Sequence, residues 1–146
     1  MTIDDIITVA TNAGFSGDDL VTAVAVAIAE SSGNPNALGD IGIGQGSFGL
    51  WQINSKFHPE FGPNFSTLYD PQTNANAAYA IYTQAGNSFT PWSTFKTGSY
   101  QQFVTSVAAA IAVFVTQNPV ESATIGTGVL IAIAVVVWFL MKPKKG

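Results

Sequence analysis

Several residue types that build common functional sites are missing or rare in this 146-residue sequence. It has no cysteine, so it forms no disulfide and holds no metal through thiolates, and its one histidine, His58, excludes a site of several imidazoles. We therefore predict no metal and no cofactor. It also has no arginine, and all nine acidic residues lie at or before Glu121. This acidic body argues against nucleic-acid binding, which requires clustered positive charge against phosphate.

Charge of either sign is scarce, because Asp, Glu, Lys and Arg make up 10% of the chain, against roughly 25% in typical globular domains. The shortage is greatest in residues 123–141, a run of 19 residues without a charge. Such a run is long enough to cross the roughly 30 Å hydrocarbon core of a bilayer. Trp138 and the lysines of the basic tail, residues 142–146, are typical interfacial anchors. We predict one C-terminal transmembrane helix, with a buried core helix as the alternative.

Apolar spacing in the rest of the chain predicts a mainly α fold. Helices are expected over residues 3–13, 16–31, 74–84 and 99–116. Their expected caps are Thr2 with Asp5, Ser16 and Asp70. Six glycines in residues 33–49 predict a loop or a short hairpin instead. The chain then divides into a domain of residues 1–102, an apolar helix and linker over 103–122, and the membrane helix with its tail.

Glu30 is the first residue that points to chemistry. It lies in the last turn of a helix that is apolar nearly all round. A carboxylate in such a place costs several kcal/mol unless it is paired or protonated. Burial disfavours the charged form and raises the pKa, as a glycosidic general acid requires near neutral pH. The alternative is a solvent-facing glutamate at a helix end, and the pattern alone does not choose between the two.

A second informative stretch, SFGLWQIN, occupies residues 47–54. Its glycine permits close approach of the backbone to a ligand, and its aromatic residues offer surfaces on which a sugar ring can stack. Gln52 and Asn54 can supply neutral hydrogen bonds. The alternative is a packed hairpin, in which Trp51 belongs to the core; for Trp51 we favour the core.

Taken together, the two stretches resemble the lysozyme-like lytic transglycosylase superfamily, in particular the compact soluble-lytic-transglycosylase-type domains common in phage proteins. The resemblance rests on Glu30-Ser31, on residues 47–54, and on the sequence LYDP at residues 68–71 followed by Asn74. It covers roughly residues 5–102. It implies a helical lysozyme-like fold with a glycan cleft between its lobes.

The resemblance also implies a mechanism for cutting the MurNAc–GlcNAc β-1,4 bond of peptidoglycan. Glu30, at the catalytic position of the family, would protonate the glycosidic oxygen. The same residue would then remove a proton from the muramic-acid 6-hydroxyl as that oxygen attacks C1, which gives a 1,6-anhydro sugar without consuming water. Hydrolysis would instead use two carboxylates, and the second candidate is Asp40. A solvated loop aspartate is the alternative for Asp40.

The remaining predicted site residues are polar and aromatic. Predicted substrate-binding residues are Ser31, Ser47, Gln52, Asn54, Tyr79 and Trp92. Larger relatives carry an Ala-Tyr-Asn-Ala-Gly segment whose tyrosine contacts the catalytic glutamate, and this sequence lacks it. Tyr79, Tyr82 or Trp92 could substitute for that tyrosine. We expect His58 to be structural or exposed, and Lys56 and Lys96 to be solvated.

Two features of the sequence conflict over the membrane side. Lysines after the apolar run favour a cytoplasmic tail and a domain that faces the wall, but the chain starts without a basic signal region for export. A membrane-containing phage, assembled in the host cytoplasm, would resolve the conflict, and the chain is similar to the peptidoglycan-cutting membrane proteins of icosahedral phages. The expected location is therefore the membrane of a lipid-containing virion, or otherwise the bacterial inner membrane. Expected partners are peptidoglycan, the bilayer through residues 123–141, and other virion membrane or capsid proteins. The alternative function is a non-catalytic glycan-binding or structural virion membrane protein.

Overall fold

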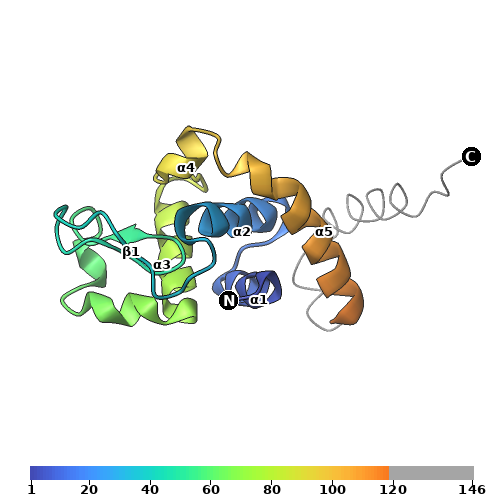
Figure 1. Cartoon of the computed structure of the whole chain (residues 1–146), viewed down its shortest axis with the longest axis horizontal. Helices are drawn as coiled ribbons and strands as arrows, with labels where there is room; N and C mark the ends of the chain where they lie inside the picture. Colours follow the sequence, from blue (N-terminus) through green and yellow to red (C-terminus); the bar gives the residue numbers. More distant parts are fainter. Residues whose placement is uncertain (119–146) are drawn as a thin grey trace, which may run out of the picture.

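The computed structural model describes residues 1–118, which form a mainly helical domain (Figure 1). The helices are α1 (Ile3–Ala13), α2 (Gly17–Ser31), α3 (Pro71–Gln84), α4 (Ser93–Lys96) and α5 (Gln101–Gln117), with 3-10 helices η1 (Pro59–Phe61) and η2 (Phe65–Tyr69). The strands are β1 (Leu38–Gly39), β2 (Ser47–Phe48) and β3 (Ile53–Asn54). Within residues 1–118, no helix is both long and apolar enough to span a bilayer. The predicted transmembrane helix over 123–141 and the basic tail lie outside the described residues.

The first two helices begin and end as the sequence predicts. Thr2 and Asp5 form a reciprocal cap at the start of α1, because the Asp5 N–H donates to Thr2 Oγ1 at 3.2 Å and the Thr2 N–H donates to Asp5 Oδ2 at 2.9 Å. Gly14, at φ 119°, ends the helix in a conformation that favours glycine. Ser16 occupies the cap position of α2, but its side chain makes no capping hydrogen bond.

Helix α2 is the centre of the hydrophobic core. Residues 23–27 are fully buried, and α1, α4 and α5 all contact the helix (Figure 1). Trp51 is also fully buried, and its indole N–H donates to the Ala23 carbonyl at 3.0 Å. The prediction that Trp51 belongs to the core is therefore confirmed. Burial of α2 on most sides explains why its apolar residues show no clear helical stripe.

The glycine-rich segment folds as a small antiparallel sheet in the order β1-β2-β3. Leu38 pairs with Phe48 and Ser47 pairs with Asn54, so the hairpin alternative for residues 33–49 is correct. Asn74 of α3 fixes this sheet to the helices. Its Oδ1 accepts the Trp51 N–H at 2.9 Å, and its Nδ2 donates to the carbonyls of Phe48 and Leu68, both at 2.9 Å.

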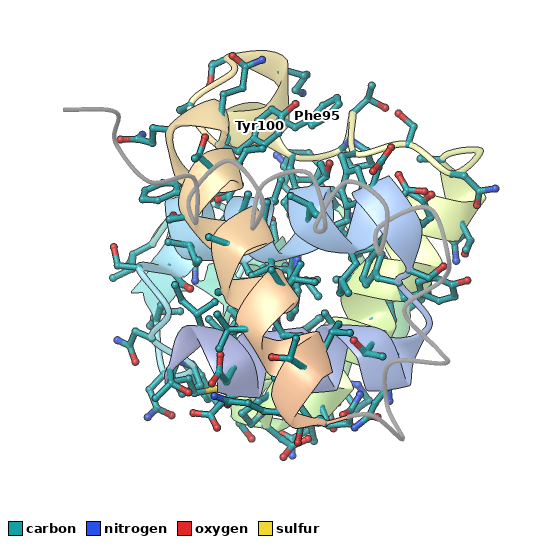
Figure 2. All side chains as sticks on the ribbon, turned by 90° about the vertical axis from the view of Figure 1, so that its right-hand side faces the viewer. Phe95 and Tyr100 are labelled. Atoms are coloured by element: carbon teal, nitrogen blue, oxygen red, sulfur yellow. The ribbon has the colours of Figure 1, made fainter. Side chains whose placement is uncertain are left out.

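The later helices differ from prediction mainly at their ends. Helix α3 begins at Pro71, three residues before the predicted start, and Asp70 caps it by accepting the Thr73 N–H at 2.8 Å. The predicted helix over 99–116 is α5. Helix α4 was not predicted, because four residues are too few to show a helical period. Figure 2 shows Phe95 and Tyr100 together at the turn between α4 and α5, where their rings stack with centroids 5.1 Å apart.

Candidate active site

Glu30 lines a cavity of about 260 Å³ that α2, the sheet and the start of α4 enclose. Of the residues that the sequence predicts for the site, the cavity is lined by Glu30, Asp40, Ser47, Gln52, Asn54 and Trp92. The other lining residues are Ile43, Phe57, Pro91, Ser93 and Lys96. Because these residues come from separate parts of the sequence, the fold brings together the two stretches that carried the prediction.

The environment of Glu30 favours the protonated carboxyl. The side chain is half-buried, and this burial is the main cause that raises its pKa above the usual value of 4.5. Thr94 acts in the opposite direction, because its hydroxyl donates to Glu30 Oε1 at 2.7 Å and stabilises the ionised form. The negative charge of Asp40 adds a smaller upward effect on the pKa. The site of Glu30 therefore accommodates both forms of the carboxyl group, since burial favours the protonated form and Thr94 stabilises the ionised form.

Asp40 is exposed, but a short polar chain orients its carboxylate. The Ser47 hydroxyl donates to Asp40 Oδ2 at 2.6 Å and accepts from the Asn54 amide at 3.0 Å. Ser47 and Asn54 are both buried, so this chain starts inside the domain and ends at the cavity. The backbone of Asp40 has φ 48°, an uncommon conformation that aspartate tolerates better than most residues. The structure thus brings Asp40 to the same cavity as Glu30, and its carboxylate is hydrogen-bonded within the loop.

Gln52 braces the loop and leaves one atom for a ligand. Its Nε2 donates to the carbonyls of Ala37 at 3.1 Å and Gly49 at 2.9 Å, so both amide hydrogens have protein partners. Gly39 lies directly against Gln52 Oε1, and a side chain there would collide with that oxygen. Of the amide atoms of Gln52, Oε1 is therefore the one that can accept a hydrogen bond from a sugar hydroxyl.

Trp92 forms part of the cavity wall, and a hydrogen bond to the backbone of Trp51 fixes its indole ring. Its indole N–H donates to the Trp51 carbonyl at 2.9 Å, and the side chain is buried. The same residue precedes α4, which carries Thr94 and Lys96. The wall and the hydrogen-bond partner of Glu30 thus belong to one short segment.

Two predicted substrate-binding residues lie elsewhere. Ser31 is buried, where its hydroxyl donates to the Ala27 carbonyl at 2.8 Å and accepts the Gly33 N–H at 3.2 Å, so it stabilises the end of α2. Tyr79 packs edge-on against Phe15, with ring centroids 5.0 Å apart, because α3 turns this face toward the α1–α2 connection. Neither side chain lines the cavity with Glu30, so this geometry does not support a role in substrate binding for Ser31 or Tyr79.

Tyr82 does not replace the missing family tyrosine either. Its hydroxyl donates to Asp19 at 2.7 Å, and it lines a separate cavity with Tyr79. Burial and the hydrogen bond to Asp19 raise the pKa of Tyr82 to about 12. The group that contacts Glu30 is instead Thr94, which the sequence prediction missed. The one signal in the sequence that could have indicated this role is that Thr94 is a polar residue two positions after Trp92, which was predicted to bind substrate.

A second cavity, of about 240 Å³, lies beside the first. Both cavities are lined by Gln52, Asn54, Phe57, Pro91 and Trp92, and His58 lines only the second. His58 is partly exposed, and its Nδ1 lies 3.2 Å from Glu60 Oε1. Because the two cavities share these lining residues, they lie side by side, and we refer to them together as the groove. In the part of the chain that the structure describes, no group of three or more His, Cys, Asp or Glu side chains is placed to hold a metal ion.

Comparison with known proteins identifies one family. Residues 7–94 match the family model described as "Lysozyme like domain". This segment runs from α1 into α4 and includes Glu30, Asp40 and Thr94. No curated protein and no solved structure matches the chain.

Proposed function

Because the chain belongs to the lysozyme-like domain family, we propose that it is a peptidoglycan lytic transglycosylase with Glu30 as its general acid and base. The observation that carries this proposal is the setting of Glu30. It lines the groove, burial raises its pKa, and the Thr94 hydroxyl fixes one carboxylate oxygen. A carboxyl group with a raised pKa holds its proton to higher pH than usual and can donate it to a glycosidic oxygen.

The reaction follows in two proton transfers. Protonated Glu30 donates its proton to the oxygen that links C1 of the muramic residue to the next sugar, and the C1–O bond breaks. Glu30 is then ionised, and the Thr94 hydroxyl stabilises the carboxylate. The muramic 6-hydroxyl attacks C1, its proton passes to Glu30, and the O6–C1 bond closes the anhydro ring. Atoms balance without water, and Glu30 regains the proton that it gave.

Hydrolysis is the second candidate, and the hydrogen bond from Ser47 to Asp40 is the observation that favours it. That bond orients a second carboxylate in the cavity of Glu30. In a hydrolase, this carboxylate would serve as the nucleophile or would activate water. A non-catalytic glycan-binding or structural protein is the remaining alternative, and such a protein would not require a glutamate with a raised pKa in the groove.

The experiment is mass spectrometry of the muropeptides that the full-length protein in detergent releases from purified sacculi. We expect anhydro-muropeptides from the native protein, none from Glu30→Gln, and the native pattern from Glu60→Gln. Glu60 is the matched control because it pairs with His58 and does not line the cavity of Glu30. Reducing ends in place of anhydro ends would establish hydrolysis. No release from folded protein would leave the non-catalytic alternative.

We also propose that residues 123–141 anchor the domain in a bilayer, and that this bilayer is the membrane of a lipid-containing phage virion. The bacterial inner membrane, with the domain facing the wall, is the second choice. The support is the uncharged run followed by a lysine-rich tail. Flotation of the full-length protein with liposomes at high salt and alkaline pH tests the anchor, since a protein bound only by charge would stay at the bottom of the gradient.

A further inference from the structure

Lys96 places a positive charge in a cavity that also contains two carboxylates. It is the last residue of α4, it is exposed, and it lines the cavity with Glu30 and Asp40. Within residues 1–118 the one basic side-chain nitrogen within 4.0 Å of a carboxylate oxygen is Nδ1 of His58, beside Glu60, so no carboxylate of these residues lies within 4.0 Å of the Lys96 ammonium group. Burial, Thr94 and Asp40 are the causes that shift the pKa of Glu30, and Lys96 is not among them. Lys96 therefore lines the cavity without forming an ion pair to a carboxylate of these residues and without shifting the pKa of Glu30. Its expected solvation does not explain why it lies there.

The charge of the surrounding domain makes this position unusual. Residues 1–118 contain two lysines, Lys56 and Lys96, and the acidic residues Asp4, Asp5, Asp18, Asp19, Glu30, Asp40, Glu60 and Asp70. An anionic polymer that approaches such a surface meets net repulsion. A local cation can offset this repulsion for an anion in the groove, and Lys96 lines the groove beside the proposed acid.

The position of Lys96 relative to Glu30 is fixed by contacts on both sides of α4. Trp92, before the helix, is bonded to the Trp51 carbonyl, and Thr94, within it, is bonded to Glu30. On the far side, Phe95 stacks on Tyr100 at the start of α5 (Figure 2). These contacts position the backbone that carries Lys96 relative to Glu30, and the flexible lysine stem can adapt to a ligand.

We infer that Lys96 is a specificity-determining residue that binds a carboxylate on the muramic residue, so that the groove selects acidic glycans over neutral ones such as chitin. This rests on the proposed function, because it places the reacting muramic ring beside Glu30. The O3 substituent of that ring is a lactyl ether that ends in a carboxyl group. In bare glycan strands this carboxylate is free, and in intact peptidoglycan it is amidated by a stem peptide with carboxylates of its own. A GlcNAc ring offers no such group.

Binding to the full-length protein in detergent tests the inference, and we would measure it in the Glu30→Gln background so that no ligand is consumed. The ligands are chitohexaose, bare glycan strands, and glycan strands with stem peptides. We expect K96Q to weaken binding of an acidic glycan about three- to tenfold, as for loss of a partly exposed charge pair, and to change chitohexaose binding less than twofold. K96R should restore the acidic preference, and K56Q, the matched control, should keep it. The glycan that loses affinity identifies the lactyl or the stem carboxylate.

Three results would overturn the inference: equal loss for chitohexaose and acidic glycans, equal behaviour of K96Q and K56Q, or no binding of any acidic glycan. High salt should shrink the effect of K96Q, since screening weakens an exposed charge pair. Kinetics give an independent reading on sacculi, where K96Q should raise KM and leave kcat near the native value. Absence of all cleavage would refute the proposed function, while the binding comparison would still decide the role of Lys96.

Discussion

Replacement of Thr94 by valine tests whether Glu30 is the acid of the reaction. The Thr94 hydroxyl donates to Glu30 Oε1 at 2.7 Å, and this bond lowers the pKa of Glu30 because it favours the ionised carboxylate. Valine has nearly the same shape as threonine but no hydroxyl. T94V therefore removes the larger of the two lowering effects and leaves that of the backbone at residue 94, so the pKa of Glu30 rises further and the proton is held to higher pH.

The size of the effect follows from the strength of the lost bond. Hydrogen bonds to charged groups contribute about 1.5–3 kcal/mol, and because Glu30 is half-buried, water replaces part of the bond and leaves about 1 kcal/mol. At 1.36 kcal/mol per tenfold, the ratio of protonated to ionised Glu30 rises about fivefold at a given pH. The kcat/KM of T94V, relative to the native protein, should be about fivefold higher at alkaline pH than on the acid plateau.

The assay is release of soluble muropeptides from sacculi over a pH series, with T97V as the control. Thr97 lies just after α4, and its hydroxyl bonds to the Ser93 and Thr94 carbonyls, away from Glu30. If T94V also positions Glu30 less well, kcat/KM falls by the same factor at every pH. This factor cancels when the mutant-to-native ratio of kcat/KM at alkaline pH is compared with the ratio on the acid plateau. A ratio that stays flat with pH, as we expect for T97V, would refute the view that this hydrogen bond sets the protonation of the acid.

Three further predictions concern stability. Folding raises the pKa of Glu30 above 4.5, so the native domain loses stability as the pH rises from 4.5 through the pKa of the folded state. Glu30→Gln should therefore melt at a higher temperature than the native protein at pH 7 and at the same temperature below pH 4. Calorimetry at both pH values decides this. Asn74→Ala removes three buried hydrogen bonds and should cost about 3 kcal/mol or more, seen as a fall of about 10 °C in Tm; an unchanged Tm would contradict the anchoring role. Ser47→Ala should cost about 1–2 kcal/mol in urea unfolding because the buried Asn54 amide loses a partner, whereas Asp40→Asn should cost less; equal losses would mean that the Asp40 contact carries the effect.

The longer helices, and the place of Glu30 at the end of a buried helix, were predictable from the sequence because their signals are local. The cap pair Thr2–Asp5 and Gly14 define α1 within fourteen residues. The apolar run of α2 indicates a buried helix, and a carboxylate at its end stands out for that reason. The glycine-rich segment indicated a hairpin through composition alone, and the strands pair where the glycines permit a tight return.

The hydrogen-bond partner of Glu30 was not predictable because it comes from a distant segment. Thr94 lies 64 residues from Glu30 along the chain, and the four-residue α4 that carries it gives no periodic signal. Ser31 adjoins Glu30 in sequence, but neighbours on a helix point about 100° apart, so its hydroxyl turns back to Ala27 instead. Tyr79 shows the same limit, since its residue type suggested a role that the direction of its helix face does not support.

Helix α4 has a consequence for how the site responds to thermal motion. Trp92 and Lys96 line the cavity with Glu30, and the Thr94 hydroxyl donates to Glu30. A displacement of this segment away from α2 would therefore expose the carboxyl and break the hydrogen bond together. Exposure lowers the proton affinity of Glu30, and loss of the bond raises it. The two changes partly cancel, so a displacement of this segment changes the pKa of Glu30 less than either change would alone. For the proposed enzyme, such a displacement would therefore shift the pH range of activity less than the loss of either effect alone.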